Sequence, residues 1–249
     1  MEQGIQPHIR CGRQDRASYA ILPGDPERVD KVAKFLDNPR NIAYNREFKT
    51  ITGYYKGIKV MVTSTGIGGP SAVIVLEELR NLGVETMIRI GSCGALQAGI
   101  KLGELIIAAG AVRNDGASDA YIERGYPAVP SPEVVNSIVE SARELGFNYH
   151  CGLIRSHDSF YTDEEANIDS YWSKRGILGA DMESAALFVV GGLRKVRTAS
   201  ILNVVVESDG ELKDDINDYV DGKNTVIDGE KREIITALEA IARLENKSL

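Results

Sequence analysis

Apolar segments of strand length alternate with helix-forming segments along the 249 residues of the chain. The expected strands are residues 17–22, 58–64, 86–91, about 104–112, about 150–155 and 198–206. The expected helices are residues 72–82, about 131–145, about 181–193 and about 228–244, several of them bounded by serine, proline or glycine. This alternation predicts one α/β domain, residues 1–249, with a largely parallel sheet.

Composition narrows the functional classes. Hydrophobic residues make up 43% and charged residues 26% of the chain, which argues against a disordered or a membrane protein. The N-terminus lacks a signal-peptide pattern, and the widely spaced Cys11, Cys93 and Cys151 favour neither a disulfide framework nor a zinc cluster. We therefore expect a cytoplasmic protein without membrane or metal. The net charge of −7 disfavours a nucleic-acid partner. Because the protein as a whole is acidic, any anion must be bound by a few arginines that converge on one site.

The strand at 86–91 carries one arginine, Arg89, and leads directly into the turn Gly91-Ser92-Cys93-Gly94. A charge among Met and Ile side chains is costly unless an anion or a carboxylate meets it. The glycines let backbone N–H groups approach a ligand, and Ser92 adds a hydroxyl donor. The pattern predicts either an oxyanion site at the carboxyl end of the strand or an ion pair with a neighbouring helix.

Two further turns have the same character. In Pro23-Gly24-Asp25-Pro26-Glu27-Arg28, Gly24 offers a backbone N–H and Arg28 can fold back over the turn. Alternatively, Asp25 is a helix N-cap and Arg28 a surface residue. Residues 64–71 form a glycine-rich loop that opens a helix and can bind an anion or another polar ligand. This loop matches neither a dinucleotide fingerprint nor a P-loop.

Two acidic residues complete the candidate site. Glu183, at the start of a helix, can accept hydrogen bonds from vicinal hydroxyls such as those of ribose. Alternatively, its negative charge only stabilises the helix by interacting with the positive end of the helix dipole. Asp209 follows the strand at 198–206 and can donate a proton. It lies in the polar stretch 207–228, which is either a surface loop or an active-site lid. Together these turns suit a nucleoside and a phosphate.

Five ordered motifs resemble the nucleoside phosphorylase-I family. They are Pro-Gly-Asp-Pro-x-Arg at 23–28, Asn-Arg-Glu at 45–47, Gly-Ile-Gly-Gly-Pro-Ser at 66–71, Arg-Ile-Gly-Ser-Cys-Gly at 89–94 and Met-Glu-Ser at 182–184. The resemblance extends from Pro7 to the final helix. It implies a three-layer α/β/α fold with a central mixed, partly barrel-like sheet. It also implies a homo-oligomer built from dimers, with a hexamer as a trimer of dimers.

The resemblance also assigns roles to individual residues. Phosphate would be held by Gly24, Arg28, Arg89 and Ser92, with Arg46 reaching in from the neighbouring subunit. Ribose would be bound by Met182 and Glu183, with His8 of the neighbouring subunit on the 5′-hydroxyl. The base would contact Cys93, Gly94, Phe160, Asp181, Ser208 and Asp209. In this scheme Arg89 and Asp209 are the catalytic residues, and Phe160 stacks on the base.

The implied reaction is reversible phosphorolysis of a nucleoside, with inorganic phosphate as co-substrate and no cofactor or metal. The segment 89–94 and the pair Ser208-Asp209 resemble purine enzymes, so purine nucleosides are favoured. Uridine phosphorylase is the alternative, because residues 64–71 and 112–118 resemble that enzyme. However, residues 162–169 lack the glutamine and arginine that it uses to recognise uracil.

A phosphate-independent nucleosidase and a non-catalytic nucleoside-binding protein are further alternatives. A water nucleophile needs no anion cage, and a pseudoenzyme is expected to lose part of one. The chain retains Arg28, Arg46 and Arg89, which favours the phosphorylase over both.

Overall fold

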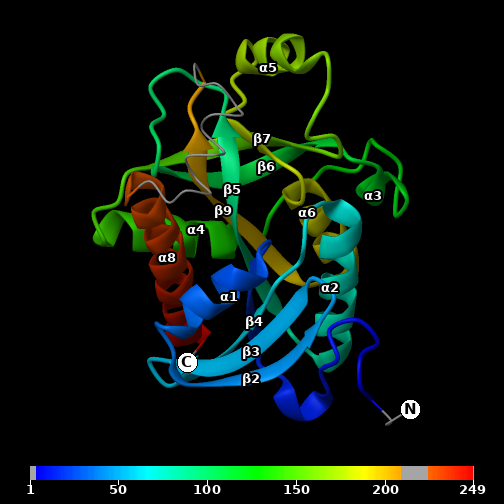
Figure 1. Cartoon of the computed structure of the whole chain (residues 1–249), viewed down its shortest axis with the longest axis vertical. Helices are drawn as coiled ribbons and strands as arrows, with labels where there is room; N and C mark the ends of the chain where they lie inside the picture. The colour runs from blue at the N-terminus through cyan, green and yellow to red at the C-terminus, as the bar shows by residue number, and fades with distance from the viewer. Residues whose placement is uncertain (1–3, 209–223, 249) are drawn as a thin grey trace.

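The computed structural model describes residues 4–208 and 224–248. Within these residues, nine strands form one mixed sheet (Figure 1). The strands are β1 (Tyr19–Pro23), β2 (Asp37–Asn45), β3 (Phe48–Tyr55), β4 (Ile58–Thr63), β5 (Thr86–Ala95), β6 (Leu105–Asn114), β7 (Tyr149–His157), β8 (Gly179–Asp181) and β9 (Arg197–Val206). The helices are α1 (Pro26–Ala33), α2 (Gly69–Leu82), α3 (Gly116–Asp119), α4 (Pro132–Glu144), α5 (Glu165–Ser173), α6 (Ser184–Arg194) and α8 (Asn224–Ser248), with a short 3-10 helix at Arg13–Asp15.

Half of this sheet closes on itself. The strand order is β2-β3-β4-β1-β5-β8-β7-β6-β9, and β5 also pairs with β9. Strands β5, β8, β7, β6 and β9 therefore form a closed barrel, while β1 to β4 extend from its side. The expected mixed, partly barrel-like sheet between helical layers is confirmed.

The expectation of a largely parallel sheet holds only in part, because five strand pairings among the described residues are parallel and four are antiparallel. Strand β3 is antiparallel to both β2 and β4, and β5–β8 and β6–β9 are also antiparallel pairs. The connections between β2 and β3 and between β3 and β4 are only two residues long, and such short turns can join antiparallel strands only.

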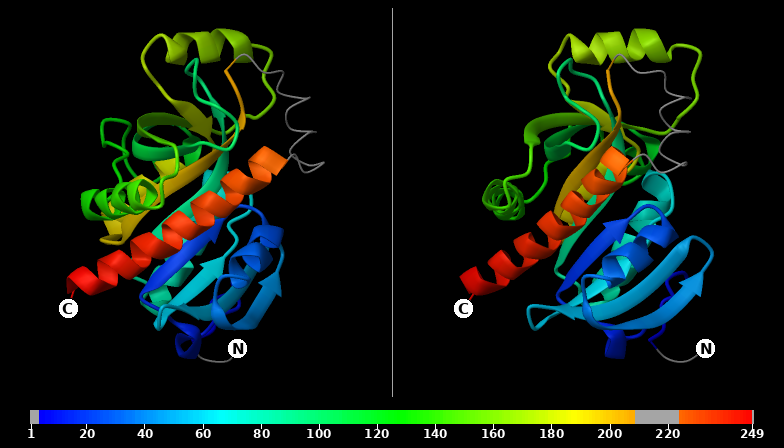
Figure 2. Two further views of the ribbon diagram at one scale, coloured as in Figure 1. Left: turned by 90° about the vertical axis from the view of Figure 1, so that its left-hand side faces the viewer. Right: turned by 60° about the vertical axis from the view of Figure 1, so that its left-hand side comes forward.

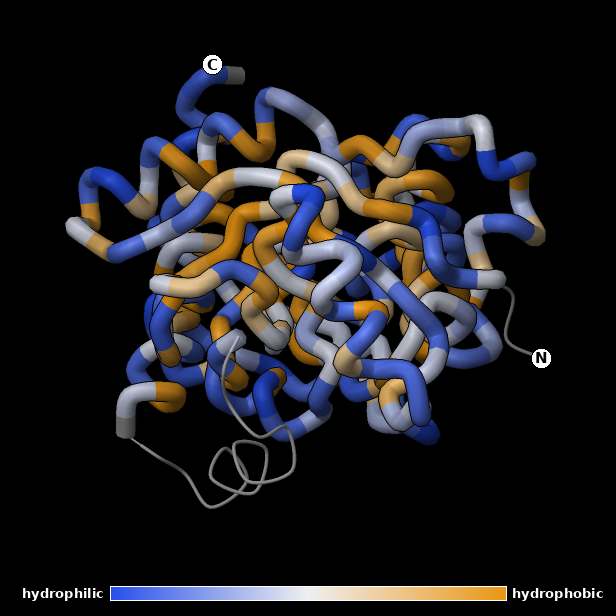
Figure 3. The backbone as a smooth tube through the Cα atoms, turned by 90° about the horizontal axis from the view of Figure 1, so that it is seen from above, coloured by the Kyte–Doolittle hydropathy of each residue, from blue (hydrophilic) through white to orange (hydrophobic). Residues whose placement is uncertain are grey.

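Alternation of side chains along the strands builds a core on each face of the sheet. Ala20 and Leu22 pack in the core beneath α2 and α6, whereas Tyr19 and Ile21 pack in the core beneath α1, α4 and α8. Figure 2 shows α8 running diagonally across its face of the sheet, and Figure 3 shows apolar segments gathered in the interior.

Several elements differ from the sequence-based expectation. The sequence does not predict the hairpin β2–β3 or the helices α3 and α5, and it offers α1 only through the alternative in which Asp25 is a helix N-cap. The helix expected at about 181–193 begins at Ser184, because Gly179–Asp181 pairs as β8. Within the described residues, no helix is both long and apolar enough to cross a membrane.

Candidate active site

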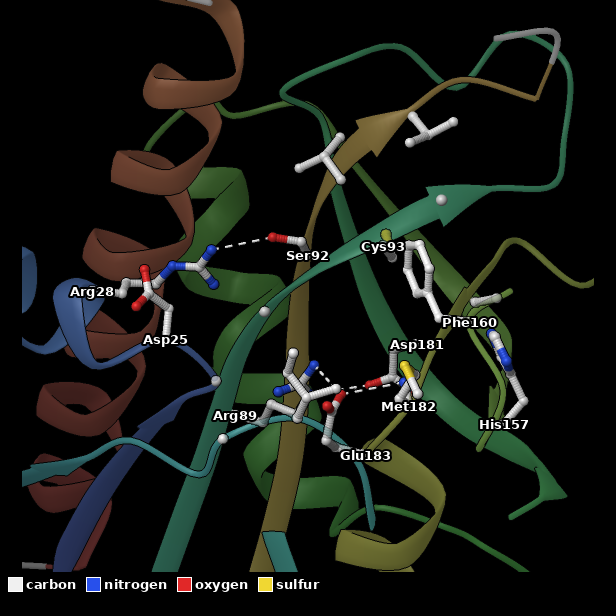
Figure 4. A pocket seen from close by; sticks show the side chains of 18 of the residues that line it. Asp25, Arg28, Arg89, Ser92, Cys93, His157, Phe160, Asp181, Met182 and Glu183 are labelled. Carbon is white, nitrogen blue, oxygen red and sulfur yellow. Dashed lines mark hydrogen bonds and ion pairs between the residues drawn. The ribbon is translucent and has the colours of Figure 1, made fainter. Parts of the chain in front are cut away.

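A cavity of about 740 Å³ opens where several strands end, and it collects most of the residues singled out from the sequence (Figure 4). The turns after β1 and β4 form one side of it, and the ends of β5, β7, β8 and β9 form the rest. The predicted residues that line it are Gly24, Arg28, Arg89, Ser92, Cys93, Gly94, Phe160, Asp181, Met182 and Glu183.

Arg89 is buried at the centre of this arrangement. Its neighbours on β5, Ile88 and Ile90, point into the core on the α8 side, so the arginine points to the opposite face of the sheet. Its Nε lies 3.0 Å from Oδ2 of Asp181, and its Nη2 lies 2.5 Å from Oε2 of Glu183. The ion pair raised as one alternative from the sequence is therefore present, and both of its carboxylates line the cavity, while the oxyanion site stays a prediction.

The third guanidinium nitrogen of Arg89 is unsatisfied. Nη1 is buried and has no hydrogen-bond partner among the described residues. Nη1 faces the turn between β1 and α1, since a Cβ added to Gly24 in that turn would lie 3.9 Å from Nη1. Gly91 is required for this placement, because a Cβ at position 91 would lie 2.5 Å from Nη2 of Arg89. A buried N–H donor without a partner is costly and indicates that a ligand acceptor belongs there.

Arg28 approaches the same region from α1 and is held by helix α8. Its Nη2 donates to Oγ of Ser92 at 3.1 Å, while its Nε and Nη1 lie 3.2 Å from carboxylates of Glu230 and Glu233. Burial raises the pKa of Glu233 to about 8 against the opposing effect of Arg28. Glu233 is therefore mostly protonated at neutral pH. Asp25 does cap α1, through the backbone N–H of Glu27.

Glu183 stands between Arg89 and the glycine-rich loop. The backbone N–H of Gly68, which has a φ of 91°, donates to its Oε1 at 2.7 Å. Burial raises the pKa of Glu183, and Arg89 opposes that rise. Asp181 is held by the hydroxyls of Ser156 and Ser184 at 2.5 and 2.6 Å. Asp181 and Glu183 thus hold the Arg89 guanidinium in place, and Glu183 also borders the open cavity.

The end of the cavity remote from Arg28 is mainly apolar. Phe160, Val205 and Val206 line it, together with Cys93, whose thiol pKa burial raises well above its ordinary value. His157, the last residue of β7, also lines this end. A flat aromatic ligand can be enclosed here.

His8, Arg46 and Ser208 are not among the cavity-lining residues. Nδ1 of His8 lies 2.6 Å from Glu78, and the side chain of Asn45 donates to the backbone oxygen of His8 at 2.7 Å. His8 and Arg46 therefore share one surface region, where Arg46 is exposed in the β2–β3 turn. Ser208 is exposed just beyond β9. Asp209 and most of the polar stretch 207–228 lie outside the described residues.

Sequence reasoning missed Glu230, Glu233 and His157. The glutamates lie three residues apart on α8 and contact the same arginine, but acids at helical spacing are usually solvated. His157 lies three residues before the predicted Phe160, but the strand expected at about 150–155 ends before it, whereas β7 extends to His157 and places it at a strand end.

Comparison with known proteins identifies the relatives of this chain. Residues 18–242 match the model of the phosphorylase superfamily. A uridine phosphorylase from Thermococcus kodakarensis is 42% identical over 215 residues, covering 82% of this chain and 78% of that protein. A guanosine phosphorylase from Halorubrum lacusprofundi is 37% identical over 226 residues, covering 87% and 93%.

A solved structure agrees with these relatives. The crystal structure of uridine phosphorylase from Vibrio fischeri superposes with a TM-score of 0.91 at 44% identity, covering 98% of this chain and 99% of that one. The chain belongs to the phosphorylase superfamily.

Proposed function

We propose that this protein is a uridine phosphorylase, which transfers the ribosyl group of uridine to inorganic phosphate. The buried Nη1 of Arg89, which lies beside Gly24 and has no hydrogen-bond partner among the described residues, is the observation that carries the proposal. The uridine phosphorylases among its relatives favour uridine over the purine nucleosides expected from the sequence. Guanosine is the second candidate substrate, because one relative is a guanosine phosphorylase.

The proposed reaction follows from the order of groups along the cavity. Phosphate bound by Arg89, Ser92 and the Gly24 backbone lies on one side of the ribose, and uracil lies beside Phe160 on the other. A phosphate oxygen forms a bond to C1′ as the bond from C1′ to N1 of uracil breaks. The electron pair of the broken bond passes to uracil and spreads over its carbonyl oxygens. The products are ribose 1-phosphate, with inversion at C1′, and uracil once it has taken up a proton.

In this scheme Glu183 accepts hydrogen bonds from the ribose hydroxyls. Its Oε2 is shared with Arg89, so a single carboxylate links the sugar to the phosphate-binding arginine. Developing positive charge on the ribose lies between this carboxylate and the phosphate, which stabilises the transition state more than the ground state. These groups need no cofactor beyond phosphate.

The charge balance of the site supports a contribution from a second copy of the chain. Among the described residues at the phosphate end, Arg28, Arg89 and Lys31 are paired with Asp181, Glu183 and Glu230, so these charges offset one another. With Glu233 protonated, a phosphate dianion still adds uncompensated negative charge. We propose that Arg46 of a second subunit supplies the missing cation and that His8 of that subunit reaches the ribose.

Such a homodimer contains two shared sites, and three dimers can assemble as a hexamer. The surface that carries His8 and the exposed Arg46 supports this arrangement, since the two residues are linked through Asn45. The free Cys11, Cys93 and Cys151 are compatible with action in the cytoplasm.

A substrate panel tests the proposed function. Purified enzyme is incubated with uridine, guanosine, inosine or adenosine, with and without phosphate, and the released base is quantified by chromatography. We expect uracil release that requires phosphate. Base release at the same rate without phosphate would identify a nucleosidase, and nucleoside binding without any release would identify a binding protein.

A further inference from the structure

Among the described residues, His157 is a hydrogen-bonding side chain at the apolar end of the cavity. It lies beside Phe160 in Figure 4, across the cavity from Arg28. The neighbouring Asp181 is already engaged by Arg89, Ser156 and Ser184. Among the described side chains, the imidazole is therefore the one placed to give a base enclosed at this end a directional polar contact.

The structure fixes which nitrogen of His157 carries the proton. Nδ1 lies 2.9 Å from the backbone oxygen of Ser159, and a carbonyl oxygen can only accept a hydrogen bond. Nδ1 is therefore the donor. Among the described residues, none forms a hydrogen bond with Nε2.

The environment favours the neutral form of the ring. Burial lowers the pKa of His157 and nearby Arg155 lowers it further, while the Ser159 carbonyl, Asp181 and Asp169 act in the opposite direction. With Nδ1 protonated and the ring neutral, Nε2 keeps its lone pair. His157 thus offers the cavity a hydrogen-bond acceptor in a fixed tautomer.

We propose that Nε2 of His157 accepts a hydrogen bond from the ring N–H of the base and so selects nucleosides whose base carries one. This inference rests on the proposed function. In uridine, N3–H is the only N–H of the base, and guanine presents N1–H. Cytosine N3 and adenine N1 carry lone pairs instead, which would face the lone pair of Nε2.

Recognition of a ring N–H by His157 accounts for two otherwise separate observations. Residues 162–169 contain neither glutamine nor arginine, so the polar edge of uracil needs another partner. The named relatives act on uridine and on guanosine, which differ in ring size but share a protonated ring nitrogen beside a carbonyl group.

The test compares uridine with 3-methyluridine, in which a methyl group replaces the N3 proton. The proteins are the wild type, His157→Phe, whose ring fills similar space without an acceptor, and the matched control His157→Gln, whose amide oxygen can accept. Binding is measured by calorimetry without phosphate, and kcat/KM is measured with phosphate. Circular dichroism and thermal unfolding show that each variant is folded.

We expect His157→Phe to weaken uridine binding about tenfold, while 3-methyluridine binding changes little. The preference for uridine should therefore shrink in this variant and persist in His157→Gln. An unchanged preference in folded His157→Phe would overturn the role of His157 even if phosphorolysis is normal. Conversely, the wild type could prefer uridine over 3-methyluridine in binding and yet release no uracil when phosphate is added. That result would refute the proposed function and leave the role of His157 standing.

Discussion

Replacing Arg89 with lysine isolates the part of this residue that faces the ligand. The guanidinium contacts Asp181 through Nε and Glu183 through Nη2, which leaves Nη1 for phosphate. A lysine keeps the positive charge, but its single nitrogen cannot reach both carboxylates and a ligand in this geometry. Arg89→Ala is a poorer test, because leaving both buried carboxylates without their cation costs about 3–5 kcal/mol of stability.

The magnitude follows from the lost contact. A hydrogen bond between charged groups contributes about 1.5–3 kcal/mol. Losing one to bound phosphate corresponds to a rise of roughly 10- to 150-fold in the KM for phosphate. The KM for uridine should change far less, since Arg89 reaches the nucleoside only through Glu183.

Initial rates of uracil release are measured with phosphate varied at saturating uridine and with uridine varied at saturating phosphate, which gives the KM for each substrate. Thermal unfolding with and without phosphate serves as the control for folding, and phosphate should stabilise the wild type more than Arg89→Lys. A phosphate KM within about threefold of wild type in a folded variant would refute the assignment of Nη1 to phosphate.

Three further predictions test other parts of the site. When Arg46→Ala and Arg89→Lys proteins are mixed by unfolding and refolding and assayed at a phosphate concentration far below their raised KM values, about a quarter of wild-type activity should appear if each site takes Arg46 from a second subunit, whereas no gain over the unmixed proteins would place Arg46 outside the site. Glu183→Gln should reduce kcat/KM for uridine by about tenfold or more, with a smaller loss for 2′-deoxyuridine, and equal losses would remove the 2′-hydroxyl from its partners. Burial raises the pKa of Glu233 from 4.5 to about 8, so the folded protein retains a proton that the unfolded chain has lost, and stability falls as pH rises through this window. Urea midpoints at about pH 5 and about pH 8 should therefore differ less in Glu233→Gln than in the wild type, and an unchanged difference would refute the raised pKa.

Elements with a strong local signal were predictable from the sequence. The buried strand β5 is a run of apolar residues, and α2 is bounded by proline at its start and Gly83 at its end. Strand β2 has no such signal, because most of its residues are exposed and Pro39 interrupts it. The β2–β3 turn also lacks glycine, and Arg46 adopts a φ of 57° there.

The site was predictable where motifs follow strands and unpredictable where contacts come from distant segments. Arg89, Ser92 and Glu183 follow from their positions at strand and helix ends. The contact of Arg28 with Glu230 spans 202 residues, so no local pattern reveals it. Closure of the barrel through β5 and β9 is likewise a tertiary property, since either strand alone predicts only a buried segment.

Phosphorus NMR of the complete reaction tests the central claim most directly. The wild-type enzyme is incubated with uridine and phosphate. The phosphorus signals identify and quantify the sugar phosphate and inorganic phosphate, and chromatography of the same sample quantifies uracil and free ribose. We predict ribose 1-phosphate and uracil in equal amounts, with inorganic phosphate consumed to match. Uracil accompanied by free ribose, with phosphate unchanged, would contradict the assignment of the Arg89 cavity to a phosphate nucleophile.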